Sequence, residues 1–287
     1  MTPQPLFAEA RRRYHDALLA SVLTSDANGV VSNADDGNAA SVRIARAIAE
    51  LLGTLTIKPK AKGQTAGKVF ENLCRAFLAD TFLALGHLRP GKWSLQVLEQ
   101  RDKHGIAQFE QYAHLLALAK AVQQSPELAT VLGNDYLITP DIVVFRDPVS
   151  DDEINTTKVL VDGVVAARSP LRKSSGSQAL IHASVSCKWT LRSDRAQNAR
   201  SEALNLIRNR KGRVPHIVSI TGEPLPGRIA SLALGTSDLD CVYHFALPEL
   251  LQVVTQDAYP DAYETLRTLV EGKRLRDISD LPLDLCI

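Results

Sequence analysis

Apolar residues recur at three- and four-residue spacing through much of the first third of the chain. This period predicts amphipathic helices over residues 7–23 and 39–52, and a longer one over residues 65–88. A basic loop that contains a glycine, residues 58–64, leads into the third of these helices. We therefore expect the first third of the chain to be mainly helical.

Strand-like segments appear from residue 93 onwards and alternate with helical ones. The segment after Pro140 is rich in β-branched residues, and an opening proline is typical of a buried strand. The pattern predicts strands over residues 93–98, 140–145, 180–189, 216–221 and 241–245. It predicts helices over residues 109–123, 196–210 and 229–234, and again from the last strand to the C-terminus. Strands interleaved with helices favour an α/β fold, with a mixed central sheet flanked by helices.

Residues 147–180 have the least core-like composition, with an acidic run at one end and a stretch rich in serine and glycine at the other. Between them, residues 158–167 alternate around Asp162-Gly163, which is a strong signal for a β-hairpin. A chain of 287 residues can bury a large core without disulfides or structural metals. We therefore expect a single domain over residues 1–287, with a hairpin inserted around residues 147–180.

Composition and cysteine usage exclude several classes of protein. Hydrophobic residues make up 45% and charged residues 23% of the chain, as in a soluble globular protein. No apolar run approaches the roughly 20 residues of a membrane span, and no signal peptide is evident. The four cysteines lie far apart, without a CxxC pair, which argues against a zinc site and for a reducing compartment. We expect a cytoplasmic protein.

The net charge of +1 says nothing about nucleic acid, but the distribution of charge does. Residues 188–228 carry nine lysines and arginines against three acidic residues. Such a basic stripe is a modest indication of a phosphate-bearing partner. A solvated helix face would give the same pattern, so both interpretations stay open at this point.

Three residues along this pattern have the chemistry of phosphodiester hydrolysis. Asp141 begins one predicted strand, Lys188 ends a later one, and Glu202 lies 14 residues further on, in the next predicted helix. This reaction needs carboxylates that hold Mg²⁺ against the phosphate, and a lysine beside them can orient the attacking water. Ser186 and Lys188 share one face of a strand, whereas Cys187 points into the core and can still offer its backbone carbonyl to the metal.

The residues after Lys188 add chemistry for reading DNA. Arg192 and Arg195 can make bidentate contacts with guanine, and Asp194 can accept a hydrogen bond from cytosine. At the start of a helix that follows the metal-binding strand, they would lie beside the place of cleavage. An N-capping Asp194 between two solvated arginines would give the same pattern, so this alternative also stays open.

The order of these residues resembles that of a known family. It is Glu71, Pro140-Asp141, Ser186-Cys187-Lys188, Arg192-Ser193-Asp194-Arg195 and Glu202. The order is similar to that of the tetrameric type IIF restriction endonucleases of the CCGG group, which belong to the PD-(D/E)xK superfamily. The run from Lys188 to Glu202 is the specific part of the match. The resemblance extends over the full chain and is closest to members that cut GCCGGC.

The resemblance implies a magnesium-dependent type II restriction endonuclease with a PD-(D/E)xK core, which cuts duplex DNA and leaves 5′ overhangs. It assigns the bridging of the metals to Asp141, further ligands to Glu71, Glu202 and the Cys187 carbonyl, and action on the nucleophilic water to Lys188. It also implies a homotetramer, a dimer of dimers that binds two DNA copies. A cognate methyltransferase is expected in the same cell.

The resemblance assigns the DNA contacts as well. Arg192, Asp194 and Arg195 would read the inner CCGG through the major groove. Arg228 would read the outer G·C pair, and Gln64 would reach the minor groove. The last two assignments depend on position in the sequence alone.

One departure from the superfamily pattern concerns the position two residues before Lys188. It holds Ser186 instead of an acidic residue. The CCGG group is similar in taking the missing carboxylate from the following helix, which is why Glu202 is assigned. For Glu71, an ordinary ion pair with Arg75, four residues further on, is an open alternative.

Other functions are compatible with parts of the pattern. Residues 63–69 look like a phosphate-binding loop, but the glycines are one residue too close and Val69 replaces the metal-binding serine or threonine. A repair or junction-resolving nuclease of the same superfamily would usually keep an acidic residue at position 186. A non-catalytic DNA-binding protein would not need the catalytic constellation, and it predicts binding without cleavage.

Overall fold

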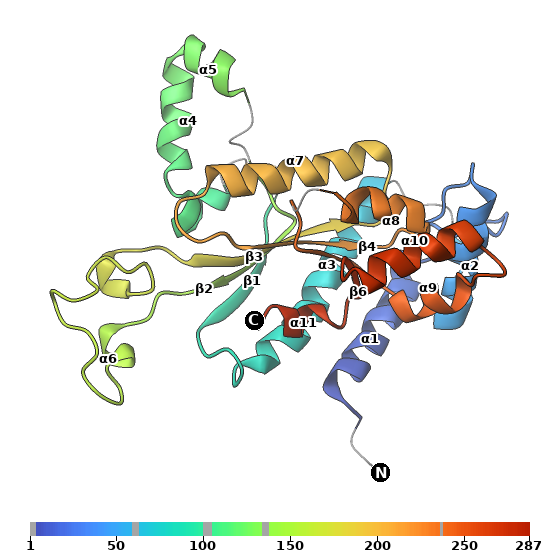
Figure 1. Cartoon of the computed structure of the whole chain (residues 1–287), viewed down its shortest axis with the longest axis horizontal. Coiled ribbons are helices and arrows are strands. Elements are labelled where there is room, and N and C mark those ends of the chain that lie inside the picture. Colours follow the sequence, from blue (N-terminus) through green and yellow to red (C-terminus); the bar gives the residue numbers. More distant parts are fainter. Residues whose placement is uncertain (1–3, 59–62, 100–104, 134–137, 236–237) are drawn as a thin grey trace.

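The computed structural model describes residues 4–58, 63–99, 105–133, 138–235 and 238–287, and it gives only the backbone of residues 193–195. At its centre lies one six-stranded sheet with helices around it (Figure 1). The mixed α/β class predicted from the sequence is therefore confirmed. No helix within the described ranges is long and apolar enough to cross a membrane.

The strands follow one another across the sheet in chain order, as β1 (Trp93–Val97), β2 (Ile142–Arg146), β3 (Leu180–Lys188), β4 (His216–Thr221), β5 (Cys241–His244) and β6 (Leu275–Asp277). β1, β2 and β3 pair antiparallel, whereas β3, β4, β5 and β6 pair parallel. β3 is long and almost entirely buried, as expected of a strand that helices cover on both faces.

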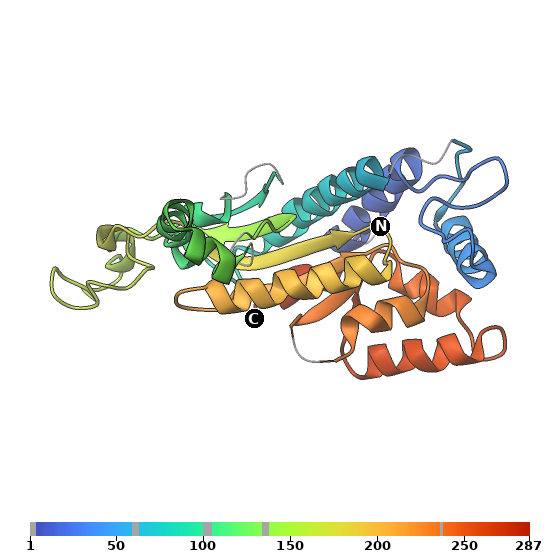
Figure 2. The ribbon, with the colours of Figure 1, turned by 90° about the horizontal axis from the view of Figure 1, so that it is seen from above.

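Two groups of helices cover the two faces of the sheet (Figure 2). One group is α1 (Leu6–Ser21) and α3 (Gly63–Phe82), which contact each other, and α3 also contacts β1 and β3. The other group is α7 (Ser193–Asn209), α8 (Pro226–Ala233) and α10 (Pro260–Glu271). The remaining helices and 3-10 turns are α2 (Ala39–Leu52), η1 (Leu83–Leu85), η2 (Gly105–Gln108), η3 (Glu110–Tyr112), α4 (Leu115–Gln124), α5 (Pro126–Leu132), α6 (Asp151–Ile154), η4 (Lys173–Ser175), α9 (Leu247–Val253) and α11 (Leu281–Asp284).

The ends of the N-terminal helices follow from local chemistry. The side chain of Asn38 caps α2 by accepting a hydrogen bond from the Ser41 backbone N–H. Gly53 ends the same helix with a φ of 157°, a conformation that favours glycine. The predicted helix over residues 65–88 is shorter than expected, because α3 ends at Phe82 and a 3-10 turn follows.

The pattern had predicted only helices after the strand over residues 241–245, but the C-terminal part also contains a strand. The three-residue strand β6 pairs with β5 between α10 and α11. Three residues are too few for an alternating pattern, so periodicity could not detect this strand.

The β-hairpin predicted within residues 147–180 is wrong. Residues 158–167 contain no strand, and the Asp162 carboxylate accepts hydrogen bonds from two backbone N–H groups that follow it, which closes a turn. Arg172 holds the segment together through an ion pair with α6 and bonds to two backbone carbonyls. An alternating pattern forms a stable strand when one face can be buried, but here Val164 remains 86% exposed.

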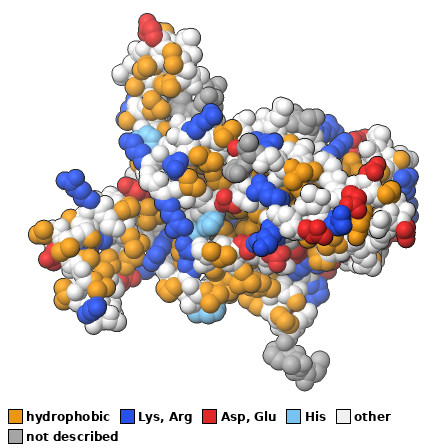
Figure 3. All heavy atoms as spheres, viewed as in Figure 1, with side chains coloured by type: hydrophobic (Ala, Val, Ile, Leu, Met, Phe, Trp, Pro, Cys, Tyr) orange, Lys and Arg blue, Asp and Glu red, His pale blue; other side chains and the backbone are white. Residues whose placement is uncertain are grey.

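Two parts of the chain stand away from the body of the molecule (Figure 1). One is the connection between β2 and β3, residues 147–179, termed the β2–β3 arm below. The other is formed by α4 and α5. Hydrophobic side chains lie on the surface of both projections (Figure 3), and Val159 and Val131 are 82% and 81% exposed.

Candidate active site and DNA-reading surface

The predicted catalytic residues meet where β2 begins beside the end of β3. Asp141 directly precedes β2, and the first residue of β2, Ile142, pairs with Val185 of β3. This antiparallel register places Asp141 beside the last residues of β3. Its Oδ2 atom accepts a hydrogen bond from the backbone N–H of Cys187 (2.7 Å) and another from Lys188 Nζ (3.1 Å). Asp141, Cys187 and Lys188, which the sequence motif predicted to act together, are therefore in direct contact.

Lys188 is held as a cation at this point. Burial alone lowers the pKa of Lys188, but the carboxylates of Asp141 and Glu202 outweigh burial and raise it. The backbone carbonyl of Lys188 accepts hydrogen bonds from the Gly222 N–H (3.1 Å) and from Thr221 Oγ1 (2.9 Å), which fixes the end of β3 against the end of β4. A protonated lysine in this position can orient a water molecule and offset negative charge.

Glu202 reaches the same point from α7. Burial raises the pKa of Glu202 to about 8; the charge of Lys188 opposes this shift and that of Asp141 adds to it. Its Oε1 atom is buried and has no hydrogen-bond partner among the described residues. Ser186 Oγ, which lies one position before Cys187 on β3, is buried without a partner as well. Such unpaired buried oxygens need an explanation, and a bound cation would be one.

Glu71 of α3 is close enough to Asp141 for their charges to interact. Burial raises the pKa of Glu71, with Lys68 opposing the shift and Asp141 adding to it. Its ion pair is with Lys68, three residues before it, at 2.7 Å, and not with Arg75 as the alternative interpretation had it. Within the described residues, no three histidine, cysteine or acidic side chains come together closely enough to form a metal site by themselves.

A cavity of about 630 Å³ is lined, among others, by Gln64, Lys68, Glu71, Asp141, Lys188 and Asn198, whereas Glu202 is not among the described residues that line it. Gln64, which was predicted to touch DNA, therefore lines the same cavity as three of the predicted catalytic residues, Glu71, Asp141 and Lys188. Asn198 was not predicted. It lies four residues before Glu202, a spacing that places two side chains on one face of a helix and could have identified it.

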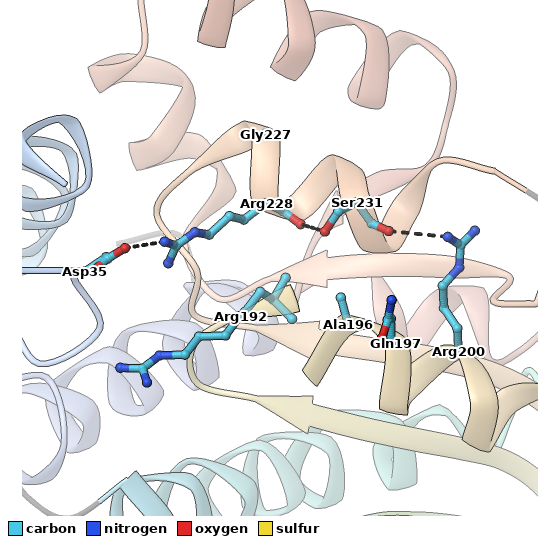
Figure 4. A pocket seen from close by; sticks show the side chains of 9 residues that line it. Asp35, Arg192, Ala196, Gln197, Arg200, Gly227, Arg228 and Ser231 are labelled. Carbon is cyan, nitrogen blue, oxygen red and sulfur yellow. Dashed lines mark hydrogen bonds and ion pairs between the residues drawn. The ribbon is translucent and has the colours of Figure 1, made fainter. Parts of the chain in front are cut away.

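A second cavity, of about 620 Å³, lies beside the start of α7 (Figure 4). Arg192, at the start of α7, and Arg228, on α8, extend toward the same side of it. Asp35, from the loop before α2, forms an ion pair with Arg228, and this contact lowers the pKa of the Asp35 carboxyl. Asp35 was not predicted, because its partner lies 193 positions away and Asp35-Asp36-Gly37 is typical of an ordinary turn.

The remaining predicted DNA-reading residues, Asp194 and Arg195, lie in the first turn of α7, and their side chains are outside the described residues. The helix begins at Ser193, and its N-cap residue is Arg192. Asp194 is thus the second residue of the helix, and the alternative interpretation of its side chain as a cap lies outside the described residues.

Some arginines of the basic stripe have structural partners. Arg200 donates a hydrogen bond to the Leu234 carbonyl (2.9 Å) and lies 3.6 Å from the Asp238 carboxylate. Arg210 donates to the Ile207 carbonyl of its own helix. Arg200 and Arg210 of the basic stripe are thus engaged in contacts within the protein, so the number of basic residues in the stripe overstates the charge that is free to bind a ligand.

Comparison with known proteins identifies the family. The family model described as "NgoMIV restriction enzyme" matches residues 14–287. The "Type II restriction enzyme NgoMIV" of Neisseria gonorrhoeae is 53% identical to this chain over 284 residues, which cover 99% of this chain and 99% of that enzyme. The family predicted from the run between Lys188 and Glu202 is therefore confirmed. The chain belongs to the family of the NgoMIV restriction enzyme, and it is a DNA-binding, type II site-specific deoxyribonuclease.

Proposed function

We propose that this enzyme cleaves duplex DNA at a palindrome that contains CCGG, with GCCGGC as the full site, by magnesium-dependent hydrolysis that leaves 5′ overhangs. The observation that carries the proposal is the arrangement of the two cavities. Catalytic residues line one and base-reading arginines line the other, and a hollow of about 400 Å³ that includes Trp189, Arg192 and Arg228 borders both. A nuclease of this specificity would need a cognate methyltransferase to protect the DNA of its own cell.

The acidic residues of the catalytic cavity fit a hard divalent cation, which type II restriction enzymes generally use. Asp141, Glu71, Glu202 and the Cys187 carbonyl would hold Mg²⁺, and the buried, unpartnered Oε1 of Glu202 supports this assignment. Mg²⁺ binds few protein oxygens and keeps several waters, so the described side chains need not form a closed set. When bound, the metal lowers the pKa of a coordinated water and offsets charge on the phosphate.

The chain itself positions the reacting groups. The Cys187 N–H and Lys188 Nζ fix one oxygen of Asp141, so that its orientation does not depend on the ligand. Lys188, a cation in this environment, would orient the attacking water and stabilise the charge that develops on the phosphate. Glu202 would supply the carboxylate that an acidic residue at position 186 supplies in the general superfamily pattern.

Recognition would use the second cavity and the first turn of α7. Arg192, Asp194 and Arg195 would read the inner CCGG through the major groove, and Gln64 would approach the minor groove. Arg228 would read the outer G·C pair, since bidentate contact with guanine suits a guanidinium group. The ion pair with Asp35 would hold Arg228 in the orientation that this contact needs.

The target is tested with methyl-free plasmids that carry one GCCGGC site, or the same site with the outer pair exchanged. We expect Mg²⁺-dependent linearisation of the first plasmid only, with ends that sequence as 5′ overhangs. On a further plasmid with an inner pair exchanged, Arg192→Ala should lower the ratio of the cleavage rate at GCCGGC to the rate at the altered site by at least about tenfold. Arg46→Ala, which removes an exposed arginine on α2, should not change that ratio. Cleavage at another sequence, structure-selective nicking or no cleavage would refute the proposed target.

We also propose that the enzyme is a homotetramer that binds two DNA copies. The β2–β3 arm supports this, because it exposes Val159, Leu160, Val164 and Val165 by 52–86%. Clustered exposed apolar residues mark interaction surfaces, and a second copy of this chain would cover them.

The assembly is tested with Val159→Asp combined with Val164→Asp, and with Leu283→Asp on α11 as an exposed control. We expect the double variant to sediment as a smaller species and to cut one-site and two-site plasmids at equal rates per site. Wild type and the control should prefer the two-site plasmid, and a short duplex that carries the site should stimulate them on the one-site plasmid. A wild-type enzyme that is dimeric and shows no preference would refute the tetramer.

A further inference from the structure

One buried carboxylate contacts both segments that lead into the DNA-reading helices. Glu223 follows β4 and is only 1% exposed. Its Oε2 atom accepts a hydrogen bond from the backbone N–H of Leu191 (2.8 Å), and its Oε1 atom accepts one from the backbone N–H of Leu225 (3.2 Å). Leu191 directly precedes Arg192, and Leu225 is the N-cap residue of α8, the helix that carries Arg228. A single side chain thus connects the starts of α7 and α8.

Glu223 also lies near one of the reading arginines. Arg228 Nη1 is 4.0 Å from Glu223 Oε2, while the same guanidinium group pairs with Asp35. The guanidinium group of Arg228 therefore lies near two carboxylates, the buried one of Glu223 and the half-buried one of Asp35. This arrangement restricts the guanidinium group more than either carboxylate would do alone.

The two residues before Glu223 connect the same turn to the catalytic strand and to the Asp35 loop. Thr221 Oγ1 and the Gly222 N–H both donate to the Lys188 carbonyl. The Gly222 carbonyl accepts a hydrogen bond from Asn33 Nδ2 (2.7 Å), and Asn33 is itself 1% exposed. Gly222 packs so tightly that a Cβ atom there would lie 2.5 Å from the Trp189 ring. Residues 221–223 therefore connect the end of β3, the loop that contains Asn33 and the starts of α7 and α8.

A carboxylate at this position is costly for the fold. Burial raises the pKa of Glu223 to about 7, although the N–H groups of Leu191 and Leu225 and the charge of Arg228 oppose the shift. The two hydrogen bonds also require two acceptor oxygens. Glutamine has one acceptor oxygen and one NH₂ donor, so it can satisfy only one of the two backbone N–H groups. The residue type therefore matches the task of joining two segments.

We propose that Glu223 is a positioning residue that sets the distance between Arg192 and Arg228, and thereby the selectivity of the enzyme for its base sequence. The inference rests on the proposed base-reading roles of these two arginines. Glu223 itself is buried, so it would act through the backbone of Leu191 and Leu225.

The test compares Glu223→Gln with Asp277→Asn in the full-length enzyme. Asp277 is a matched control, because it is 6% exposed, accepts a hydrogen bond from the N–H of Leu247 at the start of α9, and pairs with an arginine, Arg11. Single-turnover cleavage rates are measured on GCCGGC and on duplexes with one inner or one outer pair exchanged. We expect Glu223→Gln to lower the ratio of correct to altered cleavage by about tenfold or more, and Asp277→Asn to lower stability without changing the ratio.

A second variant keeps the inference testable if Glu223→Gln does not fold. Leu225→Pro removes the backbone N–H that donates to Glu223 Oε1, together with a partly buried leucine side chain. The φ of −90° at Leu225 lies about 25° from the value that proline prefers, so the backbone has to adjust only slightly. We expect this variant to lose selectivity at the outer pair, which Arg228 reads, and to keep it at the inner pairs.

Unchanged ratios in Glu223→Gln, or in Leu225→Pro where the former is unfolded, would overturn the positioning role. Equal loss of selectivity in Asp277→Asn would overturn it too, because a general loss of stability would then explain the effect. A wild-type enzyme that does not cut GCCGGC would instead refute the proposed target. The same ratios would then be measured on the site mapped from plasmid fragments, and they decide the role of Glu223 in the same way.

Discussion

Replacing Glu202 with glutamine is expected to stabilise the metal-free enzyme and to abolish its cleavage of DNA. Burial raises the pKa of Glu202 from 4.5 to about 8, despite the opposing charge of Lys188. At pH 7 the folded protein therefore keeps a proton that the unfolded chain has released. The difference spans about 2.5 pH units at about 1.36 kcal/mol each, which puts the cost to the folding free energy at about 3 kcal/mol. Glutamine has the same shape and no such cost.

The sign of this effect sets its pH dependence. A carboxyl whose pKa rises on folding destabilises the fold above its unfolded pKa, so the cost is absent well below pH 4.5 and grows up to about pH 8. The gain from Glu202→Gln should therefore shrink from about 3 kcal/mol at pH 7 to about 1 kcal/mol or less at pH 5. A bound divalent cation would stabilise wild type but not the variant, since only the carboxylate is a strong ligand.

The assay is urea denaturation of both proteins in EDTA at pH 5, 6 and 7, repeated with Mg²⁺ at pH 7, together with single-turnover cleavage of a short duplex. Glu50→Gln is the control, because Glu50 is an exposed glutamate in an i,i+4 pair on α2 and should change stability by less than about 0.5 kcal/mol. Equal stability of wild type and Glu202→Gln in EDTA at every pH would refute the buried, destabilised carboxylate. Normal cleavage by the variant would refute its role as a metal ligand.

Three further outcomes are expected. Asp141→Asn should abolish cleavage in a gel assay and leave binding of the site, measured by fluorescence anisotropy, intact or tighter, because it removes a carboxylate but no base contact. Burial lowers the pKa of His182 to about 4, so the unfolded chain binds more protons than the folded protein below about pH 6.5. The free energy of unfolding of wild type should therefore fall between pH 8 and pH 5 in urea titrations, and this fall should be about 2 kcal/mol smaller in His182→Gln. Combining Ser186→Glu with Glu202→Ser should restore measurable single-turnover cleavage relative to Glu202→Ser alone, and no recovery in a folded double variant would contradict the exchange of carboxylates between strand and helix.

Much of the sheet could be predicted from the sequence because its longer strands carry the signals that periodicity detects. The predicted strand over residues 216–221 coincides with β4, and the strand over residues 180–189 differs from β3 by one residue. The β2–β3 arm could not be predicted in the same way. Most apolar residues of its alternating pattern are exposed instead of packing against another part of the chain. Arg172 stabilises turns there through hydrogen bonds to backbone carbonyls that no local pattern indicates.

The residues proposed for catalysis were easier to find from the sequence than those of the proposed reading surface. Few residue types can hold Mg²⁺ or activate water, so chemistry limited the candidates for Asp141 and Lys188. The contact between Asp35 and Arg228 joins residues that are 193 positions apart, and an arginine and an aspartate are common on any surface. Nothing in the sequence singled out Glu223, because its hydrogen bonds to the backbone of Leu191 and Leu225 can be recognised only in the three-dimensional structure.

The geometry of α7 explains how the carboxylate proposed for catalysis can be carried by a helix instead of by β3. Glu202 lies nine residues after Ser193, the first residue of α7. At a rise of 1.5 Å per residue, these nine residues span about 13 Å along the helix axis. A straight helix fixes such a distance as firmly as a strand does, provided that its start is fixed, and the bond from the Leu191 N–H to Glu223 restrains that start. In the proposed mechanism, the reading end of α7 and the carboxylate of Glu202 would therefore move as one body, and a displacement of Arg192 would also displace Glu202.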